Sequence, residues 1–208
     1  MDYVVIAGLV RSPMGVFQSL YEPGAKKRWS MPKEEDIIGC KIAAIDPFFL
    51  EETQATAELC VKYNKSYVTI DSKHDSYLHQ HCAVNVVSKE CTESDGYKDK
   101  SIEEIYELLV ASTDGLVIIT SGENDMIYGR KGQLMKRMKP FSVDVKSTLG
   151  AGDTFKAGCV YGLLHGMEDD ELVRFASACS AIAISRFPLP LNPPTLLEVN
   201  SLLENTKK

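Results

Sequence analysis

Short runs rich in β-branched residues alternate with amphipathic segments through most of the 208-residue chain. This alternation is typical of β-α-β units, in which helices connect neighbouring parallel strands and cover the sheet. Because such crossovers are right-handed, the pattern predicts a doubly wound, mostly parallel sheet with helices on both faces. The expected fold class is therefore α/β, with Rossmann-like layers in the order helix, sheet, helix.

Local residue types also bound the individual elements. Ser101 and Glu104 form the pattern of a capping box, which marks the start of one helix. Further helices are expected from about Leu50 to Tyr63 and at Thr154–His165, Asp170–Ser185 and Thr195–Leu203. Strands are expected at Tyr3–Val10, Lys41–Asp46, Ser66–Asp71, Ala83–Ser88, Leu116–Gly122 and Phe141–Val145, with a hairpin that turns at Gly129–Gly132.

Charge and hydropathy narrow the classes of partner. The formal net charge of −6 argues against a nucleic-acid surface, because neutralising phosphates needs clustered Lys and Arg. No apolar run approaches the ~20 residues that cross a bilayer, and the apolar start is too short and too weakly basic for a secretory signal. We therefore expect a cytoplasmic protein that binds neither nucleic acid nor membrane.

The cysteines point to buried, reduced thiols. They form no C-x-x-C pair, and several lie within apolar helical patterns, which is unlike a disulfide framework. The stretch HQHC, His79–Cys82, offers a structural zinc site as an alternative, but no second His or Cys pair stands at a suitable spacing. The six positions are Cys40, Cys60, Cys82, Cys91, Cys159 and Cys179.

One stretch carries a chemical signal, VKSTLGAGDTFKAG at Val145–Gly158. In it Gly150, Ala151 and Gly152 precede the single carboxylate Asp153, where a predicted strand gives way to a helix. Glycines let backbone N–H groups approach an anion closely, and a helix N-terminus adds unpaired donors and a partial positive charge. A phosphate is the natural occupant, and a carboxylate beside it can accept the proton of an attacking hydroxyl. The plainer alternative is a strand-to-helix turn with an aspartate cap.

The signature TLGAGDTF, Thr148–Phe155, resembles the C-terminal motif of the ribokinase-like (PfkB) carbohydrate kinases, and its leucine is closest to the ketohexokinase branch. The upstream sequence follows the same family order of strand, T-x-G turn and hairpin. The similarity runs from Gly39 onward and implies a ribokinase-like nucleotide-binding and catalytic domain at residues 39–208. Residues 1–38 hold a strand and the segment GLVRSPMGVFQS, which is similar to part of the family's β lid.

The resemblance implies a role for each residue of the glycine stretch. Asp153 takes the place of the catalytic base, and the backbone at Gly150, Ala151 and Gly152 takes the place of the anion hole around the transferring phosphoryl group. ATP and Mg²⁺ are the implied cofactors, and a sugar or sugar-like small molecule is the implied substrate. Pairing through the lid, as in family members, would make a homodimer.

Three further positions follow from the same resemblance. Thr120 and Gly122 occupy the turn that runs beside the nucleotide in the family. Glu90, in NVVSKE, occupies the place of the glutamate that organises magnesium and its waters. That N-x-x-E motif is incomplete, because its asparagine would fall at Val87.

The sequence also departs from the family. Ser147 stands where the family carries aspartate, which weakens the case for a monovalent-cation site. These kinases are longer by roughly one small domain, and their GG-N sugar-binding segment has no counterpart in residues 1–39. After Ile184, SRFPLPLNPP replaces the family's adenine loop. Two functions therefore stay open: an ATP-dependent kinase, or a truncated, non-catalytic relative that binds nucleotide or a protein partner.

Overall fold

The computed structural model describes residues 4–7, 31–49, 51–94, 96–188 and 192–206. Within them, seven strands form one sheet whose spatial order follows the chain order. The first five strands are parallel to their neighbours, and the last two are antiparallel. The strands are β1 (Val4–Ala7), β2 (Ile42–Ile45), β3 (Ser66–Ile70), β4 (Val84–Val87), β5 (Leu116–Ser121), β6 (Asn124–Gly129) and β7 (Lys136–Met138).

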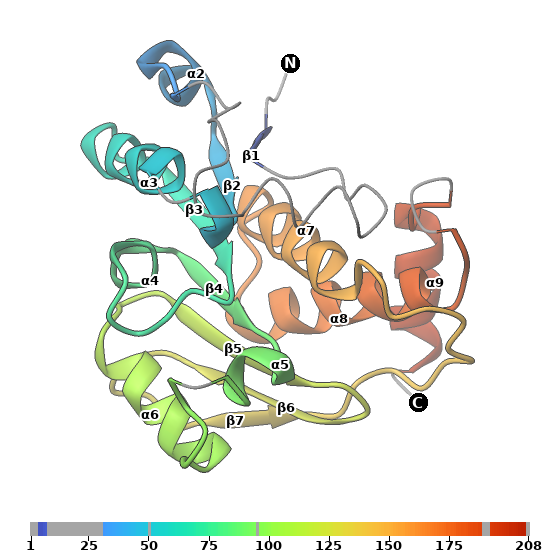
Figure 1. Cartoon of the computed structure of the whole chain (residues 1–208). Helices are drawn as coiled ribbons and strands as arrows, with labels where there is room; N and C mark the ends of the chain where they lie inside the picture. The colour runs from blue at the N-terminus through green and yellow to red at the C-terminus, as the bar shows by residue number, and fades with distance from the viewer. Residues whose placement is uncertain (1–3, 8–30, 50, 95, 189–191, 207–208) are drawn as a thin grey trace, which may run out of the picture.

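Helices cover both faces of this sheet, so the predicted three-layer α/β/α class is confirmed (Figure 1). With strands in chain order, right-handed crossovers place every connecting helix on the same face. The connecting helices are α2 (Glu34–Gly39), α3 (Glu51–Lys62), α4 (Tyr77–His81), α5 (Lys89–Thr92) and α6 (Ile102–Ala111), with a 3₁₀ turn at Pro47–Phe49. The other face is covered from the carboxyl half by α7 (Ala151–Leu164), α8 (Asp169–Ile184) and α9 (Leu196–Asn205).

Side-chain alternation along the strands divides the core between the two faces. On one face Ile118 packs with Phe155 and Cys159 of α7. On the other face its neighbour Ile119 packs with Leu109 of α6. The capping box predicted at the start of α6 is confirmed, because the side chains of Ser101 and Glu104 each accept the other's backbone N–H.

Small residues let α7 and α8 pack at close range. A Cβ on Gly158 would lie 2.6 Å from the Cα of Ala176, and one on Gly162 would lie 2.9 Å from the Cγ of Leu172. Ala176 is completely buried. The small-residue character of this pair therefore serves packing, and it lets α7 lie flat over β2, β3 and β4.

Two local predictions are wrong. The expected strand at Phe141–Val145 is absent, and the two residues that follow it are held by the carboxyl end of α8. The backbone N–H groups of Lys146 and Ser147 both donate to the carbonyl of Ile184, at 2.8 and 3.2 Å. The second error concerns the start of α7, which is expected at Thr154 but lies at Ala151.

Other expectations fall partly outside the described residues. The lid-like segment, residues 8–19, lies outside them, so the division at residues 38 and 39 stays a prediction.

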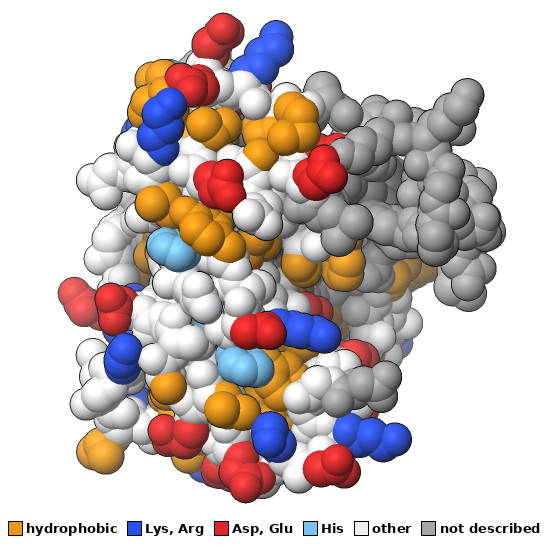
Figure 2. All heavy atoms as spheres, turned by 60° about the vertical axis from the view of Figure 1, so that its left-hand side comes forward, with side chains coloured by type: hydrophobic (Ala, Val, Ile, Leu, Met, Phe, Trp, Pro, Cys, Tyr) orange, Lys and Arg blue, Asp and Glu red, His pale blue; other side chains and the backbone are white. Residues whose placement is uncertain are grey.

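The described residues also bear on the cysteines, on membrane spans and on surface charge. All six cysteines are free thiols. In the described part of the chain, no helix is both long enough and apolar enough to cross a membrane. Figure 2 shows acidic and basic side chains interspersed over one face, without a basic patch there.

Of the two histidines in the candidate zinc stretch, His79 belongs to the core of the protein. His79 is completely buried. Its Nε2 lies 2.8 Å from the carbonyl oxygen of Leu109, and its Nδ1 lies 2.8 Å from the side-chain amide of Asn85. This pairing suits the neutral ring, which donates from Nε2 and accepts at Nδ1. Burial lowers the pKa of His79, although the Leu109 carbonyl opposes that shift.

We predict that Gly158→Ala lowers the free energy of unfolding by about 1–3 kcal/mol, because the new methyl group overlaps the α8 backbone. Chemical denaturation measures this change. The matched control is Gly39→Ala, where a Cβ meets nothing within 4 Å, so its stability should be unchanged or slightly higher. Equal stability of Gly158→Ala and the parent would contradict the close packing of α7 on α8.

We also predict that His79 makes the fold sensitive to acid. Its folded pKa lies below the unfolded value of about 6.5, so the unfolded state takes up a proton first as pH falls. Stability should therefore decline below about pH 6.5, by at most about 1.4 kcal/mol per pH unit from this group. In denaturation curves across pH, His79→Gln should remove this part of the slope, and the exposed His81→Gln should retain it. Identical slopes in all three proteins would refute the prediction.

Candidate active site

The candidate site lies at the edge of the sheet where the parallel strands end. In such sheets ligands bind beyond the carboxyl ends of the strands. Asp46 follows β2, Asp71 follows β3 and Ser88 follows β4, so all three stand at this edge. The first turn of α7 reaches the same edge, because α7 packs across β2, β3 and β4.

The glycine stretch forms the start of α7. Gly150 is the N-cap residue, with a φ of 81° that strains any residue except glycine. The helix begins at Ala151, so Ala151 and Gly152 belong to its first turn rather than to a preceding loop. A Cβ on Gly152 would lie 2.9 Å from the Cδ1 of Ile70. Glycine here therefore lets the helix N-terminus approach β3 without displacing the end of the Ile70 side chain.

Asp153 occupies the third position of α7. Its side chain is 57% exposed, and its Oδ1 lies 3.9 Å from the Nζ of Lys156, one helical turn further on. The N–H groups in the first turn of a helix have no intrahelical acceptors. An exposed carboxylate thus stands at the helix N-terminus, where the Ala151 N–H donates to the Thr148 carbonyl at 3.1 Å.

A buried ion pair that the sequence did not reveal underlies this arrangement. The Lys156 ammonium contacts the Asp46 carboxylate, and the two side chains are only 7% and 9% exposed. Thr53 holds the Asp46 backbone by donating its hydroxyl to that carbonyl, at 2.7 Å. The one available signal was a lysine on the apolar face of α7, where Phe155 and Cys159 are also buried.

Asp71 brings a further carboxylate to the same edge. Its φ of 51° lies in the left-handed region, which aspartate adopts more readily than most residues. Its Oδ1 accepts the Ser88 backbone N–H at 2.7 Å. Burial raises the pKa of Asp71 and is the largest influence on it; the Ser88 hydrogen bonds and the charge of Lys156 act in the opposite direction.

Glu90 lies next to this group, exposed in the first turn of the short helix α5. Its charge acts on Asp71 and contributes to the raised pKa of that residue. Two carboxylates from neighbouring elements therefore interact electrostatically at this edge. Carboxylate oxygens suit Mg²⁺, but among the described residues no group of three or more potential metal ligands comes together here.

The predicted nucleotide turn lies further along the same edge, where β5 passes into β6. Gly122 has a φ of 63°, which the tight turn requires. The hydroxyl of Thr120 donates to the carbonyl of Val87 at 3.4 Å and thereby links β5 to β4. Among the described residues, Asp153 lies in ion-pair range of Lys156, and the charges of Glu90 and Lys156 act on Asp71. The hydrogen bond of Thr120 goes to Val87 rather than to any of these groups.

Ser147, which stands where the family carries aspartate, is fixed by hydrogen bonds. The hydroxyl of Ser147 accepts the Leu149 N–H at 3.3 Å. The Ser147 backbone is fixed to Ile184 of α8. The loop is thus ordered through backbone contacts, and it presents no carboxylate to a monovalent cation at this position.

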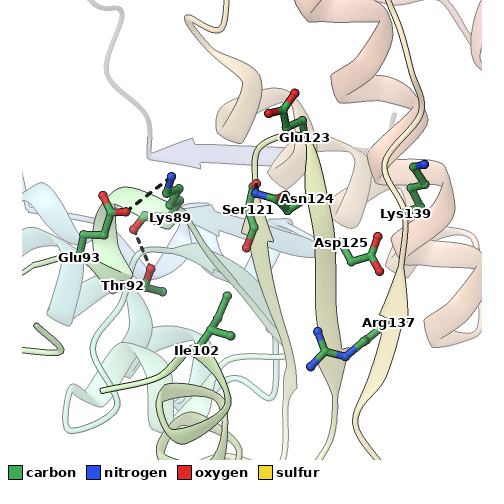
Figure 3. A pocket seen from close by; sticks show the side chains of 10 residues that line it. All are labelled: Lys89, Thr92, Glu93, Ile102, Ser121, Glu123, Asn124, Asp125, Arg137 and Lys139. Carbon is green, nitrogen blue, oxygen red and sulfur yellow. Dashed lines mark hydrogen bonds and ion pairs between the residues drawn. The ribbon is translucent and has the colours of Figure 1, made fainter. Parts of the chain in front are cut away.

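A polar hollow of about 760 Å³ lies near the nucleotide turn (Figure 3). Ile102, which lines it, packs with the core beneath α6, so the hollow opens on the face opposite α7. The hollow is therefore separate from Gly150–Asp153. Its lining residues are Lys89, Thr92, Glu93, Ile102, Ser121, Glu123, Asn124, Asp125, Arg137 and Lys139.

The chain resembles several solved structures. A putative ribokinase from Agrobacterium tumefaciens matches with a TM-score of 0.76 at 18% identity, over 91% of this chain and 62% of that one. A ribokinase from Thermotoga maritima matches with a TM-score of 0.72 at 20% identity, over 84% and 60%. A putative ribokinase II from E. coli, solved with ATP and Mg²⁺, matches with a TM-score of 0.71 at 14% identity, over 83% and 61%. These similarities establish a ribokinase-like fold.

Sequence relatives point in the same direction. A 5-dehydro-2-deoxygluconokinase from Shouchella clausii is 33% identical over 103 residues, and one from Bacillus subtilis (strain 168) is 30% identical over 105 residues. These matches cover 49% and 50% of this chain but only 31% and 32% of the relatives, so the chain matches about a third of their length. The family model described as pfkB family carbohydrate kinase matches residues 47–193. The chain belongs to this pfkB family of carbohydrate kinases.

Proposed function

We propose that the chain carries out ATP-dependent phosphoryl transfer to a hydroxyl group of a sugar or sugar-like small molecule. The observation that carries this proposal is the position of Asp153 in the first turn of α7, directly after the Gly150 cap. The exposed carboxylate is open to an incoming hydroxyl group. The adjacent first-turn N–H groups lack intrahelical acceptors, although that of Ala151 donates to the Thr148 carbonyl at 3.1 Å. Membership of the pfkB family supports the same reaction class.

In the proposed mechanism, Asp153 accepts the proton of the acceptor hydroxyl as its oxygen approaches the γ-phosphorus in line. The N–H groups at Gly150, Ala151 and Gly152 then hydrogen-bond to the phosphoryl oxygens, over which negative charge is spread in the transition state. For this step the Ala151 N–H exchanges its present acceptor, the Thr148 carbonyl, for a phosphoryl oxygen. The partial positive charge at the start of α7 acts in the same sense. The approach of Gly152 to Ile70 fixes this cradle against β3.

Glu90 and Asp71 would hold the magnesium ion, directly or through waters. When bound, Mg²⁺ neutralises charge on the nucleotide phosphates. Asp71 is restrained for this task by the Ser88 N–H. Thr120 and Gly122 would flank the nucleotide at the β5–β6 turn, with Gly122 supplying the left-handed backbone.

The acceptor is proposed only by class. The relatives named 5-dehydro-2-deoxygluconokinase suggest keto-sugars and sugar acids as the first compounds to offer. Ribose and nucleosides follow, because the structural neighbours include a ribokinase solved with ribose and a nucleoside kinase solved with inosine. The roles proposed for Gly150, Ala151 and Gly152 at the phosphoryl group are the same for each of these acceptors.

A second candidate is a non-catalytic protein that binds nucleotide. It is favoured by Ser147, which replaces the family aspartate. Calorimetry with ATP and Mg²⁺ distinguishes the two: binding without phosphorylation of any acceptor offered would support this second function.

We predict that Asp153→Asn lowers turnover about 10²–10⁴-fold, the usual contribution of a general base. The measurement is ATP consumption with the acceptor panel. The matched control is Glu171→Gln, which removes an exposed acid from the equivalent third position of α8 and should leave turnover unchanged. Equal rates for Asp153→Asn and the parent would remove Asp153 from the mechanism.

A further inference from the structure

One ammonium group stands among three carboxylates from three different elements. The Nζ of Lys156 contacts Asp46 at the end of β2 and lies 3.9 Å from Asp153 in its own helix. Its charge also acts on Asp71 at the end of β3. Lys156 and Asp46 are both buried, so water screens their interaction only weakly, whereas the Asp153 side chain is 57% exposed.

Packing alone does not explain a lysine at this position. A buried ion pair is commonly no more stabilising than apolar side chains of the same size, because both charges lose their hydration. Phe155 and Cys159, next to Lys156 on the buried face of α7, show that apolar residues are accommodated here. What Lys156 adds is a cation that reaches the exposed carboxylate of Asp153.

We infer that Lys156 is a positioning residue for Asp153, and this inference rests on the proposed function. Asp46 fixes the ammonium, and the ammonium fixes the carboxylate of Asp153 at the start of α7. Residues three apart on a helix lie on the same side, so the contact restricts Asp153 to rotamers on the side of the helix where Lys156 meets Asp46. A base held in this way is already oriented toward the acceptor hydroxyl, so less conformational entropy is lost when the reacting groups come together.

The first test needs no turnover. Asp153→Asn is made in the parent and in the Asp46→Asn/Lys156→Met background, which removes both buried charges together and so leaves neither unpaired. In the parent the substitution should lower Tm by about 1–3 °C more than in the neutral background, as expected for a partly exposed ion pair. Equal Tm changes in the two backgrounds would overturn the inference.

The second test separates positioning from binding. With an accepted substrate, Lys156→Met should lower kcat about 10–100-fold while KM for ATP stays unchanged. Lys156→Arg retains a cation and should recover most of kcat. The matched control is Lys62→Met, which breaks an exposed ion pair with Glu34 on the far side of the sheet and should leave kcat unchanged.

The outcomes distinguish the inference from the proposed function. If Asp153→Asn abolishes turnover but Lys156→Met leaves kcat intact, Asp153 is the base and Lys156 does not position it. If Asp153→Asn leaves turnover intact, the proposed function fails, whereas the Tm comparison still decides whether Lys156 holds Asp153. If no acceptor is turned over, the Tm comparison alone decides the inference.

Discussion

The buried contact between Lys156 and Asp46 is the interaction on which the site depends. Removing one partner of such a pair leaves an uncompensated charge inside the protein, at a cost of about 3–5 kcal/mol. The pair therefore fixes the rotation of α7 about its axis relative to the end of β2. Once that rotation is set, Gly152 faces Ile70 and Asp153 faces the open edge of the sheet. One electrostatic contact thus orients both the phosphate cradle and the proposed base.

The order of the strands explains why α7 is available for this role. Strands that follow one another across the sheet send their right-handed crossovers to one face. The opposite face is left for α7 and α8, which arrive after the last strand. Gly158 lets α8 press against α7, so the pair forms a thin layer and α7 remains in contact with β2, β3 and β4. Its N-terminus then meets the carboxyl ends of these strands.

Local signals in the sequence were sufficient for most of the fold. The capping box at Ser101 and the β-branched run of β5 depend on neighbouring residues, and the structure confirms both. The Lys156–Asp46 pair could not be predicted, because its partners are 110 residues apart and neither belongs to a recognisable motif. The segment Phe141–Val145 has the composition of a strand but joins no strand of the sheet. The residues directly after it, Lys146 and Ser147, donate to Ile184 of α8, a contact that only the tertiary structure determines.

Ser147 replaces the family aspartate in the loop before Gly150, and this replacement is the main argument against kinase activity. The hydrogen bonds around Ser147 weaken that argument. A missing carboxylate would matter for geometry if the loop before Gly150 depended on it for order. Here the loop is fixed at Ile184 through two backbone N–H groups, and the Ser147 hydroxyl accepts the N–H of Leu149. The hydroxyl of Ser180 on α8 also donates to the Ala151 carbonyl at 3.1 Å. The cradle is therefore ordered by α8 and the backbone, so the serine removes a charge from this loop without removing its shape.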